Sequence, residues 1–209
     1  MPRSKPSEFS LIQIIAKKIG ANPSVVRGIG DDTAVLKYTR DKYQLFTCDM
    51  LIEGTDFFSG TDPKDIGHKA IACSLSDIAA MGGRPKYALI SLGLPKTRAK
   101  KFIDGFYQGA IALTKKFKTN IVGGDLSSSE KIIVDVSMIG EVFKKNLTLR
   151  SGAKPGDIIL VSGPLGGSLY GRHLKFTPRV QEANYLVNNY PITAMLDISD
   201  GLSLDLRRL

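Results

Sequence analysis

Residues 69–83 of the chain are Lys-Ala-Ile-Ala-Cys-Ser-Leu-Ser-Asp-Ile-Ala-Ala-Met-Gly-Gly. Small and apolar residues make up most of this stretch, which is typical of a buried helix. Thr61 or Asp62 can cap its start, and Pro63 suits the first helical turn. Gly82-Gly83 is a stop signal. We therefore predict a helix from about Pro63 to the two glycines.

The stretch contains one carboxylate, Asp77. At helical spacing Asp77 shares a face with small or apolar neighbours, namely Ala70, Cys73, Ser74, Ala80 and Met81. A lone acid on that face is costly to bury unless a cation or hydrogen-bond donors accompany it. Two interpretations stay open at this point: a helix-end acid half in water, or a ligand of a cation.

The rest of the first 148 residues alternates between strand and helix patterns. Hydrophobic periodicity predicts, in chain order, a helix over 7–19, a strand over 43–48, a strand over 87–94, a long helix capped by Thr97, a short apolar run ending at 123–125, and a strand over 132–142. This order favours an α+β sandwich with the helices on one face of the sheet.

A second unit is predicted after a change in composition. Residues 147–157 are rich in Gly, Pro and polar side chains, so we place a domain boundary between residues 148 and 149. The patterns that follow predict a strand over 158–162 and a short strand over 194–202 that ends in acids and glycine. The expected domains are therefore 1–148 and 149–209.

The composition limits the classes of partner. The chain has 209 residues, 43% of them hydrophobic, and a formal charge of +9, which favours anionic partners. Ten of its 29 lysines and arginines occur in adjacent pairs without interleaved aromatics, so solvated faces are a better interpretation than a nucleic-acid surface. No apolar run approaches a membrane span, and Cys48 and Cys73 are too few for a disulfide framework. We expect a cytoplasmic protein that binds neither nucleic acid nor membrane.

Seven of the twenty acidic residues lie at predicted strand ends, in turns or among small residues: Asp31, Asp32, Asp49, Asp77, Asp125, Asp197 and Asp200. Each one alone is explained by the turn preference of aspartate. Together, without matching histidines or cysteines, they suit a hard cation such as Mg²⁺ held by carboxylates and the phosphates of a nucleotide. His68 and His173 are isolated in the sequence.

Six motifs, in order, resemble the thiamine-monophosphate kinase family. They are GIGDDTAV at 28–35, DMLIEG at 49–54, LSDIAAMG at 75–82, GGD at 123–125, RSGAKPGD at 150–157 and DISDGL at 197–202. The six in this order are specific for the wider superfamily of aminoimidazole ribonucleotide synthetase, and LSDIAAMG with DISDGL favours the thiamine enzyme within it.

The resemblance implies ATP-dependent phosphorylation of thiamine monophosphate to thiamine diphosphate with Mg²⁺. It also implies a PurM-like fold whose first-domain sheets pair across a homodimer. By position, the implied metal ligands are Asp32, Thr47, Asp49, Asp77, Asp125, Asp197 and Asp200. The implied ATP contacts are Tyr107, Gly124, Asp125, Arg150 and Ser199. Arg150 suits this role because a guanidinium can hold a phosphate through two parallel hydrogen bonds.

Two departures from the family pattern affect the acceptor. The family usually has a histidine near the substrate where this chain has Asp56, which is the implied acceptor contact here. The family's second domain continues well beyond DISDGL, so we expect residues 149–209 to be the beginning of a truncated second domain. Two alternatives therefore stay open: another ATP-using enzyme of the superfamily, or a non-catalytic nucleotide-binding or dimerisation module.

Overall fold

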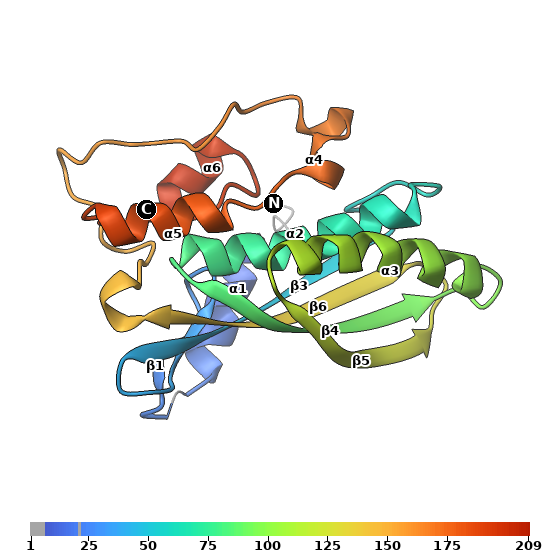
Figure 1. Cartoon of the computed structure of the whole chain (residues 1–209), viewed down its shortest axis with the longest axis horizontal. Coiled ribbons are helices and arrows are strands. Elements are labelled where there is room, and N and C mark those ends of the chain that lie inside the picture. The colour runs from blue at the N-terminus through green and yellow to red at the C-terminus, as the bar shows by residue number, and fades with distance from the viewer. Residues whose placement is uncertain (1–6, 21) are drawn as a thin grey trace, which may run out of the picture.

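The computed structural model describes residues 7–20 and 22–209. One six-stranded sheet has the strand order β1-β2-β3-β6-β4-β5. Its strands are β1 (Val25–Arg27), β2 (Ala34–Lys37), β3 (Lys42–Ile52), β4 (Arg84–Leu94), β5 (Asn120–Ser128) and β6 (Ile133–Phe143). All neighbours are antiparallel except β4 and β5, which are parallel. Helices α2 (Pro63–Ala80) and α3 (Ala99–Lys116) cover one face, as Figure 1 shows, so the predicted α+β arrangement is confirmed.

The central helix α2 has the predicted ends. Asp62 is the N-cap, and its side chain accepts a hydrogen bond from the Lys64 backbone N–H at 2.9 Å. Gly82 follows with φ +70°, a left-handed conformation that glycine adopts without strain. The apolar side of α2 enters the main core with Ile71, Leu75 and Ile78, all fully buried.

Helices α2 and α3 meet at their backbones because a glycine on each helix faces the backbone of the other. A Cβ on Gly67 would lie 2.0 Å from the Phe106 carbonyl oxygen, and one on Gly109 would lie 1.9 Å from the Lys64 carbonyl oxygen. Phe102 and Phe106 are spaced by four residues, which predicts an aromatic side of α3, and both are buried in the core. The close approach fixes α2 against the sheet.

The predicted Thr97 cap of α3 is wrong. The N-cap is Arg98, without a side-chain cap hydrogen bond. Arg98 instead forms a two-bond ion pair with the buried Glu53, at 2.8 Å for each bond, and the Ile132 N–H donates to the same carboxylate at 3.0 Å. These hydrogen bonds, with Arg98 the largest cause, lower the pKa of Glu53 to about 2. The pair ties the loop after β3 to the start of α3.

Several strands are longer than predicted. Strand β3 pairs with β6 over its whole length, from Lys42 opposite Phe143 to Ile52 opposite Ile133. Strand β5 continues through Gly123 and Gly124 to Ser128 because its backbone pairs with β4. Asp49 and Asp125 therefore lie within strands, where the sequence predicted strand ends. Hydrogen bonding to a neighbouring strand outweighs the glycine stop signal here.

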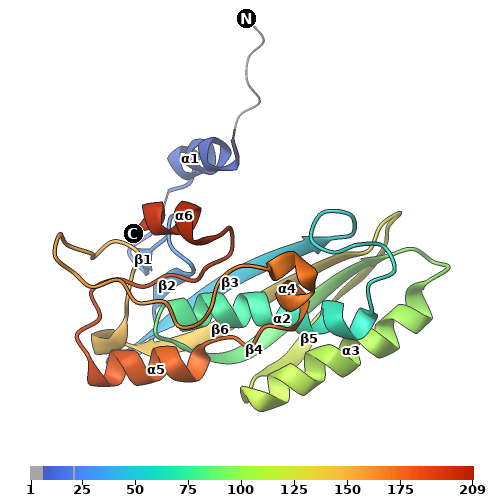
Figure 2. The same cartoon turned by 90° about the horizontal axis from the view of Figure 1, so that it is seen from above.

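At the N-terminus the predicted helix over 7–19 is confirmed as α1 (Glu8–Lys18), with Ser7 as its N-cap. After β6 and the short turn η1 (Lys144–Asn146), the chain forms η2 (Ser168–Tyr170), α4 (Arg172–Lys175), α5 (Val180–Asn189), α6 (Leu202–Asp205) and η3 (Leu206–Arg208). Figure 2 shows α4 and α5 on the same side of the sheet as α2 and α3.

The two strands predicted in the last third of the chain are wrong. Residues 158–162 and 194–199 carry no strand assignment, and Ile158 and Leu160 are 87% and 75% exposed. No strand within residues 22–209 pairs with either segment, and an isolated apolar run has no partner for its backbone groups. The boundary between residues 148 and 149 stays a prediction.

Helix α5 is attached to the C-terminal end of α2. The Asn184 side chain donates to the Gly83 carbonyl oxygen at 2.7 Å and accepts from Arg84 Nε at 3.0 Å. The Asn146 amide donates to Asn188 Oδ1 at 2.9 Å. These contacts hold the last third of the chain over the helix that carries Asp77.

The sheet face opposite α2 and α3 exposes large apolar side chains. Phe46 and Met50 of β3 and Tyr87 and Leu89 of β4 are 44 to 56% exposed. Phe46 and Tyr87 are both register partners of Ile139 on β6, so they lie in one row across the sheet. We call these four residues the open-face patch. In the part of the chain that the structure describes, no helix is both long and apolar enough to cross a membrane.

The close contact of α2 and α3 makes a first prediction. Gly109→Ala should lower the free energy of unfolding by about 3 kcal/mol, the upper part of the range for overpacking, because the added methyl group meets the Lys64 carbonyl oxygen. Gln108→Ala, at the exposed neighbouring position, is the matched control and should change stability little. Urea unfolding curves measure both. Equal stability of Gly109→Ala and wild type would contradict the packing described here.

Candidate functional site

Three carboxylates from distant parts of the sequence meet at one point. Asp32 lies in the turn between β1 and β2, Asp77 lies on α2, and Asp197 lies in the coil before α6. Each offers one oxygen, and the three oxygens lie within 4.8 Å of one another. We call Asp32, Asp77 and Asp197 the carboxylate cluster.

Strand β3 adds two more of the predicted residues next to the cluster. Thr47 and Asp49 lie two residues apart, so both point to the face that α2 covers. The Thr47 hydroxyl donates a hydrogen bond to Asp77. The Ser74 hydroxyl, one turn before Asp77 on α2, donates to Asp49 at 2.9 Å. The structure therefore brings together five of the seven predicted ligands: Asp32, Thr47, Asp49, Asp77 and Asp197.

Burial and mutual repulsion dominate the electrostatics of this group. Desolvation, followed by the charges of Asp49 and Asp197, raises the pKa of Asp77 to about 9. Desolvation is also the first cause of the raised pKa values of Asp49 and Asp197. In the absence of a cation, protons occupy part of the cluster near neutral pH.

The positively charged side chain of Arg150 contacts the carboxylate cluster. Its Nη2 and its Nε, the latter at 3.1 Å, both donate to Asp32 Oδ1. Desolvation still raises the pKa of Asp32 to about 7, although the hydrogen bond from Arg150 acts in the opposite direction. Asp31 positions this pair, since its Oδ1 accepts the Arg150 backbone N–H at 3.1 Å and the Asp32 N–H at 3.2 Å.

The other predicted ligands lie apart from the cluster. Asp125 is exposed in β5, where its nearest polar contact is the Ser127 hydroxyl at 3.4 Å. Asp200 is exposed and pairs with Arg208 at 2.7 Å. Asp56 uses its carboxylate to accept the Ile52 N–H at 2.8 Å, so that group stabilises its own loop.

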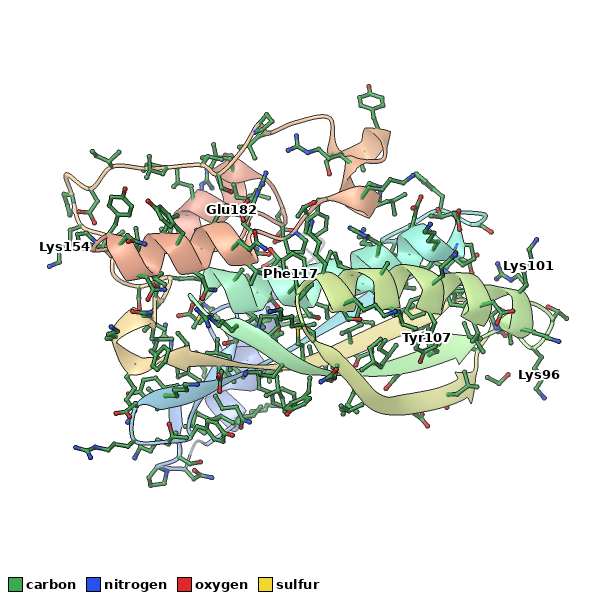
Figure 3. The ribbon with its side chains drawn as sticks, viewed as in Figure 1. Lys96, Lys101, Tyr107, Phe117, Lys154 and Glu182 are labelled. Atoms are coloured by element: carbon green, nitrogen blue, oxygen red, sulfur yellow. The ribbon has the colours of Figure 1, made fainter. Side chains whose placement is uncertain are left out.

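The remaining predicted ATP contacts lie on three elements. Tyr107 is half-buried on α3 against the core, with its position labelled in Figure 3. Gly124 of β5 has φ +158°, and a Cβ there would lie 1.7 Å from the Ile90 carbonyl oxygen, so only glycine fits. The Ser199 N–H donates to Asp205 Oδ2 at 3.0 Å.

Three residues of the site make contacts that were not predicted from the sequence, although Asp31 was among the seven acids expected to suit a cation. Ser74 holds Asp49, Asp31 holds Arg150, and the fully buried Asp205 accepts the N–H groups of residues 199, 200 and 201, each at 3.0 Å. Asp205 therefore gives the loop after Asp197 its shape. Asp205 follows Gly201 by four residues, and an acid in that position can accept the N–H groups of a turn. An acid at the start of a helix has the same spacing, so the sequence did not distinguish the two roles.

The cluster fits a hard divalent cation. All of its donors are oxygens, as Mg²⁺ prefers. Asp32 Oδ2 is buried and has no hydrogen-bond partner among the described residues. A buried carboxylate oxygen without a donor is costly, and a cation at the cluster would satisfy it.

The chain is similar to known proteins of one family. The AIR synthase related protein N-terminal domain family matches residues 30–142. A thiamine-monophosphate kinase of Rhodopirellula baltica is 41% identical, over 97% of this chain and 66% of its own length. That of Bacillus subtilis is 35% identical, over 97% of this chain and 69% of its own. The chain belongs to the thiamine-monophosphate kinase family.

A solved member of the thiamine-monophosphate kinase family has the same fold. The structure of AaThiL complexed with AMPPCP and TMP superposes with a TM-score of 0.85 at 35% identity, over 96% of this chain and 68% of that one. The chain therefore spans about two thirds of the length of the family members that it matches. The cluster, Arg150 and the α5 contacts all lie within the matched part.

If Asp77 is a cation ligand in this kinase family member, the Asp77→Asn variant should separate two effects. Without ligands it should melt at the same temperature as wild type or higher, because the amide removes repulsion by Asp49 and Asp197. Mg²⁺ with AMPPCP at 100 times Kd should stabilise wild type by about 2.7 kcal/mol and the variant far less. Thermal melts with and without ligands measure this. Asp104→Asn, at an exposed position of α3, is the control. A large loss of apo stability with full ligand stabilisation would make Asp77 structural.

The raised pKa values of Asp77 and Asp32 predict a pH dependence. Their folded-state pKa values, about 9 and about 7, lie above the unfolded value of 3.8. The apo protein should therefore lose stability as pH rises from about 4 toward 9. A cation must displace these protons, so Mg²⁺ should bind more tightly at pH 8.5 than at pH 6.5, with proton release. Calorimetry in buffers of different ionisation enthalpy measures the Mg²⁺ affinity and the number of protons released. Affinity independent of pH would contradict the prediction.

Proposed function

We propose that this chain carries the ATP-dependent phosphorylation of thiamine monophosphate to thiamine diphosphate by direct in-line transfer. The observation that carries the proposal is the buried carboxylate cluster beside Arg150, in a chain of the thiamine-monophosphate kinase family. The related AaThiL structure holds both AMPPCP and TMP, which are an ATP analogue and the acceptor.

Each part of the site has a role in this reaction. Asp32, Asp77 and Asp197, with Thr47 and Asp49 beside them, would hold Mg²⁺. When bound, Mg²⁺ neutralises charge on the transferred phosphoryl group. Arg150 would bind a nucleotide phosphate through its guanidinium and leave Asp32 to the cation. Tyr107, Gly124, Asp125 and Ser199 remain proposed ATP contacts, Asp125 and Asp200 proposed metal ligands, and Asp56 a proposed acceptor contact.

The reaction requires no general base. The acceptor is a phosphate oxygen of a phosphomonoester, whose second pKa is about 6, so it is already ionised near neutral pH. The oxygen attacks the γ-phosphorus, the bond to the β–γ bridging oxygen breaks, and ADP leaves. The protein's contribution is to align the reacting oxygens and to stabilise the charge.

The direct test incubates the chain with ATP, Mg²⁺ and thiamine monophosphate and measures thiamine diphosphate by chromatography. The proposal expects product, at least ~100-fold less with Asp77→Asn, and wild-type rates with Asp104→Asn. Absence of product from a folded chain that binds AMPPCP would overturn the proposed activity for this chain. A cytoplasmic location remains a prediction, consistent with the free Cys48 and Cys73.

We also propose a homodimer formed through the open-face patch. Four apolar side chains in adjacent rows of one sheet face form an exposed area of the kind that marks protein interfaces. Two such sheets can close into a shared barrel, which also covers strand edges.

The homodimer predicts a specific sensitivity to charge. Leu89→Asp should convert a dimer at micromolar concentration into a monomer, because the carboxylate would be buried at the interface. Ile111→Asp is the control, since Ile111 is 40% exposed on α3, away from the open-face patch. Sedimentation velocity measures the masses, and circular dichroism checks that both variants fold. A monomeric wild type would refute the dimer.

A further inference from the structure

The side chain of Lys69 on α2 is a half-buried cation without a carboxylate partner. Its Nζ donates to the Asp56 carbonyl oxygen at 2.6 Å and contacts His173 Nδ1 at 3.0 Å. None of the carboxylates described in residues 7–20 and 22–209 lies within 4.0 Å of Nζ. A partly desolvated ammonium whose contacts are neutral is suited to bind an anion.

His173 presents a second donor beside Lys69. An ammonium can only donate, so His173 Nδ1 is the acceptor in this contact, and the ring N–H is on Nε2. Desolvation and then the charge of Lys69 lower the pKa of His173 below its usual range. Lys69 and His173 therefore offer one positive charge and one neutral N–H donor from two different elements.

The short helix α4, which carries His173, is held against α2 by two further contacts. His68 Nε2 lies 2.8 Å from the Phe176 carbonyl oxygen, and Lys175 pairs with Asp65 at 3.1 Å. The segments that meet here are therefore α2, α4 and the loop of Asp56. The Asp56 carboxylate is bound to the Ile52 N–H, so the group that faces Lys69 is a neutral carbonyl.

The position of Lys69 relative to the carboxylate cluster suits an acceptor phosphate. Lys69, Cys73 and Asp77 are spaced by four residues and form one stripe along α2. Eight residues of helix separate Lys69 from Asp77 by about 12 Å along the axis. Burial and the charge of Asp49 raise the pKa of the Cys73 thiol. The charge of Lys69 on one side of Cys73 lowers this pKa, and that of Asp77 on the other side raises it. A γ-phosphate at the cluster and an acceptor phosphate in line with it would lie along this stripe.

We propose that Lys69, with His173 beside it, binds the phosphate group of the phosphomonoester acceptor and selects it over the unphosphorylated alcohol. The inference rests on the proposed kinase function and adds the residues that recognise the acceptor. Lys69 supplies the charge, and His173 supplies an N–H that orients the phosphate oxygens. Both side chains contact the acceptor, and the backbone carbonyl of Asp56 positions Lys69.

The test measures binding of three compounds by calorimetry: thiamine monophosphate, thiamine and AMPPCP. Lys69→Met should weaken binding of thiamine monophosphate by at least ~10-fold, the loss of one charged hydrogen bond, and leave thiamine and AMPPCP unchanged. His173→Phe should give a smaller loss for the same compound, and Lys69→Arg should retain most of the affinity. Lys64→Met, at an exposed position of α2 outside the proposed site, is the matched control.

The outcomes separate this proposal from the proposed activity. Unchanged binding of thiamine monophosphate by folded Lys69→Met, or equal losses for thiamine and its monophosphate, would overturn the acceptor site even if wild type makes thiamine diphosphate. A loss confined to AMPPCP would assign Lys69 to the nucleotide and also overturn it. The predicted pattern in a wild type that makes no product would support the site and refute the activity. If Lys69→Met does not fold, His173→Phe decides by the same comparison.

Discussion

Repulsion among buried carboxylates is the constraint on which this structure depends. Asp77 is on a helix packed into the core, with the charges of Asp49 and Asp197 close enough to raise its pKa to about 9. Such a group costs stability when all of its members are ionised, and the cost is relieved by a proton or by a cation. The fold holds the acids together with hydrogen bonds from Thr47 and Ser74 and contacts from Arg150, so the ligands of the proposed cation are already in place.

The rest of the fold holds three distant segments at this point. The glycine contact between α2 and α3 fixes the helix of Asp77, and the Asn184 contacts bring the last third of the chain over its C-terminal end. Asp205 shapes the loop after Asp197. The net positive charge is spread over the molecule: Lys96 and Lys101 extend from one end and Lys154 from the other, as Figure 3 shows. The positive charges that we propose for phosphate binding are local, at Arg150 and Lys69.

The sequence predicted those features of the fold that depend only on neighbouring residues. The Asp62 cap, the glycine end of α2 and the aromatic side of α3 depend on neighbouring residues and could be predicted. The length of β3 and the absence of strands at 158–162 depend on whether another strand is available to pair, which no local pattern contains. In the same way, the motifs indicated Asp32, Asp77, Asp197 and Arg150, but the hydrogen bonds from Ser74 to Asp49 and from Arg150 to Asp31 and Asp32 follow from tertiary contacts. His173 is isolated in the sequence, but the fold brings it into contact with Lys69, which lies 104 residues earlier in the chain.

We propose that the carboxylate cluster and a nucleotide phosphate bind the same cation. Pulsed electron paramagnetic resonance of Mn²⁺, a hard cation with the ligand preferences of Mg²⁺, measures this most directly in the presence of AMPPCP. We expect ³¹P hyperfine coupling from the nucleotide to protein-bound Mn²⁺ in wild type, and loss of the bound signal in Asp77→Asn. Protein-bound Mn²⁺ without ³¹P coupling, or the same bound spectrum in wild type and Asp77→Asn, would contradict it.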